Sequence, residues 1–388
     1  MLVGNLRHLR VFLAVAECGS ITQAAVRCFV SQPAVTQAIA RLEAEADTAL
    51  FLRTRHGLFA TEAGTLFQNR VARALDRLDG AMSDIAPRLA VTATRPQLAA
   101  LIATVEAQNF TLAAQRLGIA QPTVHRAITT IEASVGRALF QRSPVGVAPT
   151  RQALALALAA QLAFAELDQA VAELADLQGR EVGEIVIGSL PLARSHILPQ
   201  ALARFRTSRP RQTIRIVDGL YSDLLAGLRQ GGIDLVLGAL RESLPVDDVV
   251  QERLFDDMLA VLAGPDDPLV ATGTVAIEAL RARPWLVPRQ GTPTRNQFES
   301  LFTRAGLDLP ESIIETGSVI LMREMVSDGR HLACVSKAQA AREIERGIVA
   351  ELPFPGIAVP RPIGLTLRAG WQPTPAQQAM LDAIRAAI

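Results

Sequence analysis

The stretch AAVRCFVSQPAVTQAIARLE, residues 24–43, returns 89 residues later as AAQRLGIAQPTVHRAITTIE, residues 113–132. It is the centre of a longer repeat without gaps, in which residues 9–64 recur at 98–153 and 20 of 56 positions are identical. Positions that both copies keep are those that the unit needs whatever surrounds it. The repeat therefore predicts one small folding unit that is used twice at the front of a larger chain.

Apolar residues at helical spacing predict three helices in each copy. In the first copy one helix ends at Gly19, and a second covers about 22–28. Ser31 is placed to cap a third helix, and Pro33 falls in its first turn, where a missing N–H costs nothing. Val35 and Ile39 lie on one face of this helix, and that face should pack against the core.

The opposite face of the third helix is polar in both copies. It presents Gln32, Thr36, Gln37 and Arg41 in the first copy, and Gln121, Thr123, His125 and Arg126 in the second. Amides, hydroxyls and guanidinium groups suit base edges in the major groove of DNA. A tight turn follows in each copy, at 53–57 and 142–146, and carries Arg53, Arg55 and Arg142 toward the phosphate backbone as a wing. The plain alternative is a surface helix whose polar face is only solvated.

The first copy resembles the winged helix-turn-helix of LysR-type transcriptional regulators almost position for position. The resemblance is carried by Ala24-Ala25, Ser31-Gln32-Pro33-Ala34-Val35, Leu50-Phe51-Leu52-Arg53 and Thr61-Glu62-Ala63-Gly64. The second copy departs from this pattern at Ala120, Thr123 and 151–153, and the first departs at Ala46-Asp47. The resemblance implies double-stranded DNA as a partner. The expected DNA-binding residues are Ser31, Gln32, Pro33, Thr36, Gln37, Arg41, Arg53, Arg55, Gln121, Thr123, His125, Arg126 and Arg142.

Net charge and motif quality favour different copies as the one that binds DNA. Residues 98–153 hold five Arg against two Glu, whereas 9–64 hold five Arg against five acidic residues. Phosphate attraction favours the more basic second copy, and motif quality favours the first. The hypothesis is that both contact DNA; the alternative is that one copy is a structural or dimerisation module.

Each copy runs into a long helical pattern. Apolar residues in 61–85 and 150–178 alternate steps of four and three, which predicts a helix with a seam that needs a partner. In the resembled family the corresponding helix pairs with that of a second subunit, so a homodimer or homotetramer is implied. The first helix is expected to pack on the chain's own modules, and the second to form the main dimer seam.

From residue 183 the pattern changes to apolar strands alternating with helices, which predicts parallel sheets covered on both faces. The expected strands are 185–188, 214–217, 233–238, 258–262, 285–287 and 331–335. The order resembles the family's two-lobe, periplasmic-binding-protein-like effector domain. The predicted fold is thus multi-domain: two tandem all-α winged helix-turn-helix domains with linker helices, followed by an α/β effector domain. The expected domains are 1–87, 92–179 and 183–388, with lobe I at 183–256 and 360–388 and lobe II at 257–359.

A small-molecule effector is expected beyond the carboxyl ends of the strands. Ser189 and Leu190 follow the first strand and lead into a helix that begins near Leu192, whose N-terminus would favour an anion. Thr294, Arg295 and Ser318 match the family's effector-contacting loops. Together they suggest a carboxylate, an aromatic acid or a sugar-type ligand, although each one also suits an ordinary helix cap.

The sequence therefore predicts a cytoplasmic, ligand-responsive DNA-binding regulator that is not an enzyme and needs no cofactor. RNA polymerase is a further partner that the resemblance allows. No uninterrupted apolar stretch has the length of a membrane span, and the N-terminus lacks a secretory signal pattern. The three cysteines have no metal-ligand spacing. A remote alternative is an enzyme or a solute-binding protein on the same α/β fold, but no phosphate loop, nucleophile elbow or metal cluster is evident.

Overall fold

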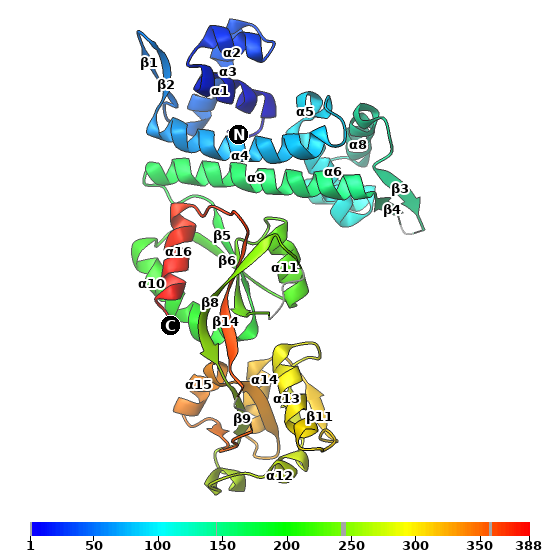
Figure 1. Cartoon of the computed structure of the whole chain (residues 1–388), viewed down its shortest axis with the longest axis vertical. Helices are drawn as coiled ribbons and strands as arrows, with labels where there is room; N and C mark the ends of the chain where they lie inside the picture. The colour runs from blue at the N-terminus through cyan, green and yellow to red at the C-terminus, as the bar shows by residue number, and fades with distance from the viewer. Residues whose placement is uncertain (1, 145, 242–245, 357–358) are drawn as a thin grey trace. The chain divides into compact units, whose positions relative to one another are not determined.

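The computed structural model describes residues 2–144, 146–241, 246–356 and 359–388. The chain forms two compact units, and the division falls near residue 184. Unit 1 is mainly Met1–Glu184, and unit 2 contains most of the remaining residues. Figure 1 shows helices and two short hairpins in the first unit, and strands with covering helices in the second.

Unit 1 uses the same order of elements twice. The first set consists of α1 (Leu6–Cys18), α2 (Ile21–Arg27), α3 (Gln32–Ala46), β1 (Phe51–Thr54), β2 (Gly57–Ala60) and α4 (Glu62–Ser83). The second set follows a short helix, α5 (Leu89–Thr92), and consists of α6 (Arg95–Ala107), α7 (Phe110–Leu117), α8 (Gln121–Val135), β3 (Phe140–Ser143), β4 (Gly146–Pro149) and α9 (Arg151–Leu177). We call 6–60 module 1 and 95–149 module 2.

Local contacts explain several positions that the two copies share. The carboxylate of Glu43 accepts hydrogen bonds from the backbone N–H groups of Leu50 and Phe51, at 2.9 and 3.1 Å. Glu132 does the same for Leu139 and Phe140, at 2.7 and 3.3 Å. In each module this glutamate therefore ties the end of the third helix to the start of the hairpin.

The hairpin glycines are a second shared feature. Gly57 has a φ of +133°, and a Cβ at this position would lie 2.6 Å from the carbonyl oxygen of Gly19. Gly146 has a φ of +144°, and its Cβ would lie 2.3 Å from the carbonyl oxygen of Gln108. The hairpin can therefore pack against the end of the first helix only where the side chain is absent.

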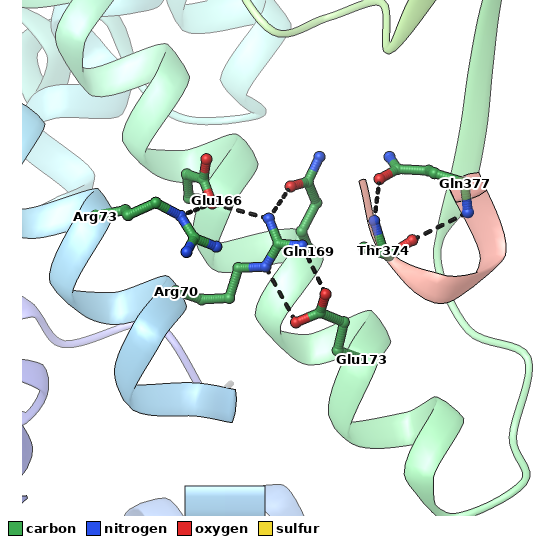
Figure 2. Close-up of polar contacts among 7 residues, drawn as sticks. All are labelled: Arg70, Arg73, Glu166, Gln169, Glu173, Thr374 and Gln377. Atoms are coloured by element: carbon green, nitrogen blue, oxygen red, sulfur yellow. Dashed lines mark hydrogen bonds and ion pairs between the residues drawn. The ribbon is translucent and has the colours of Figure 1, made fainter. Parts of the chain in front are cut away.

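The long helices α4 and α9 pack against each other within unit 1 (Figure 1). Leu167 and Leu174, which belong to the seam predicted for a second subunit, are buried in the single chain. Arg70 of α4 donates to the carboxylates of Glu166 and Glu173 on α9, at 3.0 and 2.6 Å, and to the amide oxygen of Gln169 at 2.6 Å (Figure 2).

This pairing corrects the expectation that α9 is the main dimer seam. The short connection through α5 lets α4 fold back along α9, so the apolar seams of the two helices cover each other. α9 is the one helix in the described part of the chain that is long and apolar enough, by length and composition, to cross a membrane. Its buried Glu166 and Glu173, paired with Arg70, show that here it serves as a core helix.

Unit 2 contains two five-stranded sheets, each of which defines one lobe. The first lobe has strand order β6-β5-β7-β14-β8, and the second has β11-β10-β12-β9-β13. The first lobe consists of β5 (Glu184–Ser189), η1 (Ala193–Ile197), α10 (Leu198–Ser208), β6 (Thr213–Asp218), α11 (Tyr221–Arg229), β7 (Leu235–Ala239), β8 (Val249–Asp257), β14 (Arg361–Arg368) and α16 (Pro375–Arg385). The second consists of β9 (Leu259–Ala263), η2 (Pro268–Ala271), α12 (Ile277–Arg281), β10 (Trp285–Val287), α13 (Pro293–Arg304), β11 (Ile313–Glu315), α14 (Val319–Val326), β12 (Leu332–Ser336), α15 (Lys337–Glu345) and β13 (Ala350–Glu351).

The sheets are mixed, which corrects the prediction of parallel sheets. β5 pairs with β7 in parallel, and β10 pairs in parallel with both β11 and β12. β14 is antiparallel to β7 and β8, and β9 is antiparallel to β12 and β13. The antiparallel strands include those next to the connections between the lobes, since β8 leads into β9 and β13 leads back to β14. An alternation of apolar strands and helices in the sequence does not show which of the strands run antiparallel to their neighbours.

Asp47 ends α3 in the left-handed region, with a φ of 54°, where module 2 has Gly136 with a φ of 74°. Aspartate pays a steric cost there that glycine does not, so we expect Asp47→Gly to stabilise the protein by about 0.5–1 kcal/mol. The reverse change, Gly136→Asp, should destabilise it by a similar amount. Urea unfolding of both variants tests this. A destabilised Asp47→Gly would contradict the assignment of strain to this residue.

Candidate functional site

The helices α3 and α8 present the predicted polar faces to solvent. Thr36, Gln37 and Arg41 are exposed on α3, and His125 and Arg126 are exposed on α8. Val35 and Val124 lie beneath them, fully buried in the cores of their modules. Each helix is therefore anchored by one face and leaves the other free to enter a groove.

The starts of these two helices differ. The hydroxyl of Ser31 accepts a hydrogen bond from the N–H of Ala34 at 3.4 Å, whereas Ala120 provides no side-chain cap to α8. At the start of α8 the N–H of Thr123 donates instead to the carbonyl oxygen of Ala120, at 2.9 Å. Pro33 occupies the first turn of α3, as predicted.

The arginines of the helix faces and hairpins differ in whether a carboxylate pairs with them. Arg41 donates to Glu45 at 3.1 Å. Among the described residues no carboxylate pairs with Arg53, Arg55, Arg126 or Arg142, and all four are exposed. The ring of His125 meets that of Phe110 edge to face, with centroids 5.4 Å apart. Val145, in the predicted wing of module 2, lies outside the described residues.

Unit 2 holds a cavity of about 520 Å³ between its two lobes. Residues after β5 and β7 line it from the first lobe, and residues after β10, β11 and β12 line it from the second. The walls include Leu190, Tyr221, Met322 and Val335, together with four arginines. A cavity of this size between two sheets fits a small molecule.

The four arginines in the cavity wall are not equally paired. Arg361 donates to the buried carboxylate of Asp257, at 3.2 and 2.6 Å. Arg194 lies 3.3 Å from Asp218 at the rim. Arg241 stacks on the ring of Tyr221, with its guanidinium carbon 4.4 Å from the ring centroid.

Arg241 and Arg289 carry the uncompensated charge of the cavity. Neither has a carboxylate partner among the described residues. Burial of the Arg241 guanidinium lowers its pKa, which shows that its charge lies in a poorly solvated place. Arg241 follows β7 of the first lobe and Arg289 follows β10 of the second, so each lobe contributes one cation.

Three helices of the second lobe also direct their N-terminal ends at the cavity. Their N-cap residues, Thr292 of α13, Ser318 of α14 and Ser336 of α15, all line it. The positive end of each helix dipole adds to the field of the arginines. The wall of the cavity therefore carries a concentration of positive charge.

The structure separates the predicted effector residues into two groups. Leu190, Thr294 and Ser318 line the cavity. Ser189 and Arg295 do not. Ser189 is fully buried at the end of β5, and Arg295 turns away to ion pairs with Glu299 and Glu315, at 2.7 and 3.5 Å. The helix expected near Leu192 begins with a π-helical turn, η1.

Sequence reasoning did not select the arginines of the wall. Arg289 lies five residues before Thr294 in the same loop, of which only Thr294 and Arg295 are expected from the sequence to bind the effector. Arg241 lies three residues after the predicted strand 233–238, at the carboxyl end where ligands bind, and this position was the available signal. The position of Arg361 depends on β14 returning from the second lobe, which the sequence does not show.

Comparison with known proteins gives a consistent result over the whole chain. Residues 178–388 match the family described as LysR substrate binding domain. Residues 6–65 and 96–154 match the family described as bacterial regulatory helix-turn-helix protein, lysR family. The HTH-type transcriptional regulator GalR of Pseudomonas putida is 34% identical over 391 residues, which cover 99% of this chain and 97% of that protein.

A second relative and a solved structure match a smaller part of the chain. The HTH-type transcriptional regulator PcaQ of Agrobacterium fabrum is 27% identical over 71% of this chain and 88% of its own length. The crystal structure of CbnR, a LysR family transcriptional regulator, aligns with a TM-score of 0.52 and 24% identity, over 76% of this chain and 99% of that chain. At this identity the likeness shows the fold. CbnR has also been solved in complex with its target DNA.

Proposed function

Because the chain belongs to the LysR family of ligand-responsive, DNA-binding transcriptional regulators, we propose that both of its modules bind DNA and that an anionic effector in the cavity of unit 2 controls that binding. The observation that carries the proposal is the repetition of one module with an exposed polar helix each time. α3 and α8 start 89 residues apart in the chain and each presents its polar face outward.

The proposed DNA contacts divide into two classes. Residues of the helix faces, such as Gln37 and Arg126, would contact base edges in the major groove. The exposed Arg53, Arg55 and Arg142 of the hairpins would contact phosphates, where they supply affinity and orientation but little sequence preference. Ser31 contributes by capping α3 and so holding the face in place.

The proposed effector is a small molecule with two negatively charged groups, such as a dicarboxylate. The support is the distribution of unpaired charge, since Arg241 and Arg289 stand on different lobes and face one cavity. A ligand that bridges them interacts better with the closed arrangement of the lobes than with the open one. That difference is what a ligand needs in order to shift a conformational equilibrium.

A homo-oligomer is part of the proposal, as the family implies. Because α4 covers the apolar seam of α9, a second subunit has to be held by other surfaces of the chain. The effector would then act by changing how the DNA-binding units of the oligomer are spaced.

The test is DNA affinity of two double variants, Arg41→Ala with Arg53→Ala, and Arg126→Ala with Arg142→Ala. Each loses one groove and one phosphate contact, so each should bind the protein's own upstream DNA about tenfold or more weakly, with a shallower salt dependence. Arg281→Ala, in the second lobe, is the control. If one double variant binds DNA with unchanged affinity, its module is a spacer that does not contact DNA. If both do, DNA binding through these helix faces and hairpins is ruled out.

A further inference from the structure

We infer that unit 1 is a pseudo-dimer built within one chain, and that it binds a DNA site made of two different half-sites. The inference rests on the proposed function, in which both modules bind DNA. It adds that α4 and α9 hold the modules in a two-fold arrangement without a second subunit. It also adds that the two recognition faces read different sequences.

The contacts between α4 and α9 reveal the two-fold arrangement. Arg70 reaches Glu166, Gln169 and Glu173, whereas Arg73, further along α4, reaches only back to Glu166, at 3.2 Å. The helices are therefore antiparallel. Since Arg73 lies opposite Glu166, Leu75 lies opposite Phe164 in the same register. These two residues are 89 positions apart, which is the offset of the repeat and also the offset between the starts of α4 and α9, so we treat residues at this offset as equivalent along both helices.

The same face of the repeated helix is buried in both copies. Equivalent buried pairs are Gly64 and Ala153, Phe67 and Leu156, Val71 and Ala160, Ala74 and Ala163, and Leu78 and Leu167. Antiparallel helices that cross at equivalent points through equivalent faces are exchanged by a two-fold rotation. Figure 1 agrees, because module 1 lies toward one end of the pair and module 2 toward the other.

Charge makes this pairing specific for α4 with α9. The repeat counterpart of Arg70 is Ala159, so the buried ion pairs form once and not twice. If α9 paired with another α9 at the same crossing, Glu166 and Glu173 would be buried opposite Ala159 with no cation. Burying carboxylates without a partner is strongly unfavourable.

Pairing of α4 with another α4 is disfavoured as well. The α4 counterparts of Glu166, Gln169 and Glu173 are Arg77, Gly80 and Asp84. In such a pair Arg70 would lie opposite the like charge of Arg77, and it would have one carboxylate, that of Asp84, in place of two. The two copies have therefore diverged into complementary halves, and each chain supplies both.

The recognition faces have diverged in the same way. Beyond the shared Gln-Pro start, Thr36, Gln37 and Arg41 of α3 correspond to His125, Arg126 and Thr130 of α8. Gln reads adenine and Arg reads guanine through different pairs of hydrogen bonds. Since every one of these exposed positions differs, two-fold related modules meet DNA with unlike chemistry, and the site they fit has unlike halves.

Selection of binding sites from a random DNA pool by the full-length chain tests this. We expect an enriched motif of two different half-sites at a fixed spacing. In Gln37→Ala with Arg41→Ala the base preference should fall about tenfold or more in one half only, and in His125→Ala with Arg126→Ala in the other half only. These residues are exposed, so circular dichroism should show unchanged folding, and Arg281→Gln is the control.

The outcomes separate this inference from the proposed function. A motif that is an inverted repeat of one half-site would overturn the inference and leave DNA binding intact. Loss of preference in both halves from a single double variant would also overturn it, because it would mean that two copies of one module occupy the site. If the chain enriched no sequence at all, the proposed function itself would fail.

Discussion

Replacing Arg70 with methionine should destabilise unit 1 by about 3–5 kcal/mol, the largest effect that we expect from a single substitution in this chain. The side chain of Arg70 is 3% exposed, and those of Glu166 and Glu173 are 6% and 9% exposed. Removing Arg70 leaves Glu173 buried without a cation, and it leaves Glu166 only its ion pair with the partly exposed Arg73, at 3.2 Å. Most of the desolvation of the two carboxylates is then no longer offset (Figure 2).

Two further variants show whether burial is the cause. Arg10→Met breaks the pair between Arg10 and Asp79, whose side chains are 28% and 37% exposed, and should cost no more than about 1 kcal/mol. Combining Arg70→Met with Glu166→Met and Glu173→Leu removes all three charges and should recover most of the lost stability.

Urea unfolding followed by circular dichroism measures these differences, and hydrogen exchange of α4 and α9 assigns them to unit 1. If Arg70→Met cost no more than Arg10→Met, the network would not be holding the helices together. If the triple variant were as unstable as Arg70→Met, the loss would come from packing and not from uncompensated charge.

Replacing both Arg241 and Arg289 with glutamine should nearly abolish binding of a dianionic ligand. Each charge-assisted hydrogen bond contributes about 1.5–3 kcal/mol, so each single variant should bind about 10- to 150-fold more weakly. The double variant should lose about two to four orders of magnitude where the effects add. Arg361 should not replace them, because Asp257 already neutralises it.

Calorimetric titration with acetate, benzoate, succinate and phthalate would measure this. We expect the two dicarboxylates to bind more tightly than the two monocarboxylates, and only the dicarboxylates to lose affinity in both single variants. Arg281→Gln, outside the cavity, serves as the control. Equal affinity for all four acids would contradict a ligand that bridges the lobes. So would a dicarboxylate whose affinity is unchanged in Arg289→Gln.

The sequence by itself determined the modules and the order of the domains' elements. A repeat without gaps, a capping Ser31, an early Pro33 and apolar residues every three or four positions are local signals. The structure reproduces them because helix caps and amphipathic faces depend on near neighbours. The strands 185–188, 214–217 and 285–287 were also predicted, since continuous apolar runs report buried strands.

The tertiary structure alone decided which surfaces meet. The spacing of apolar residues in α9 is the same whether the helix packs against a second subunit or against α4. Only the fold shows that Arg70 reaches Glu173, 103 positions further along the chain. Likewise, Ser189 ends β5 and Arg241 follows β7, yet the first is buried in the sheet and the second lines the cavity. Periodicity records which side of a helix or strand is buried, but the identity of the partner depends on how the chain returns through space.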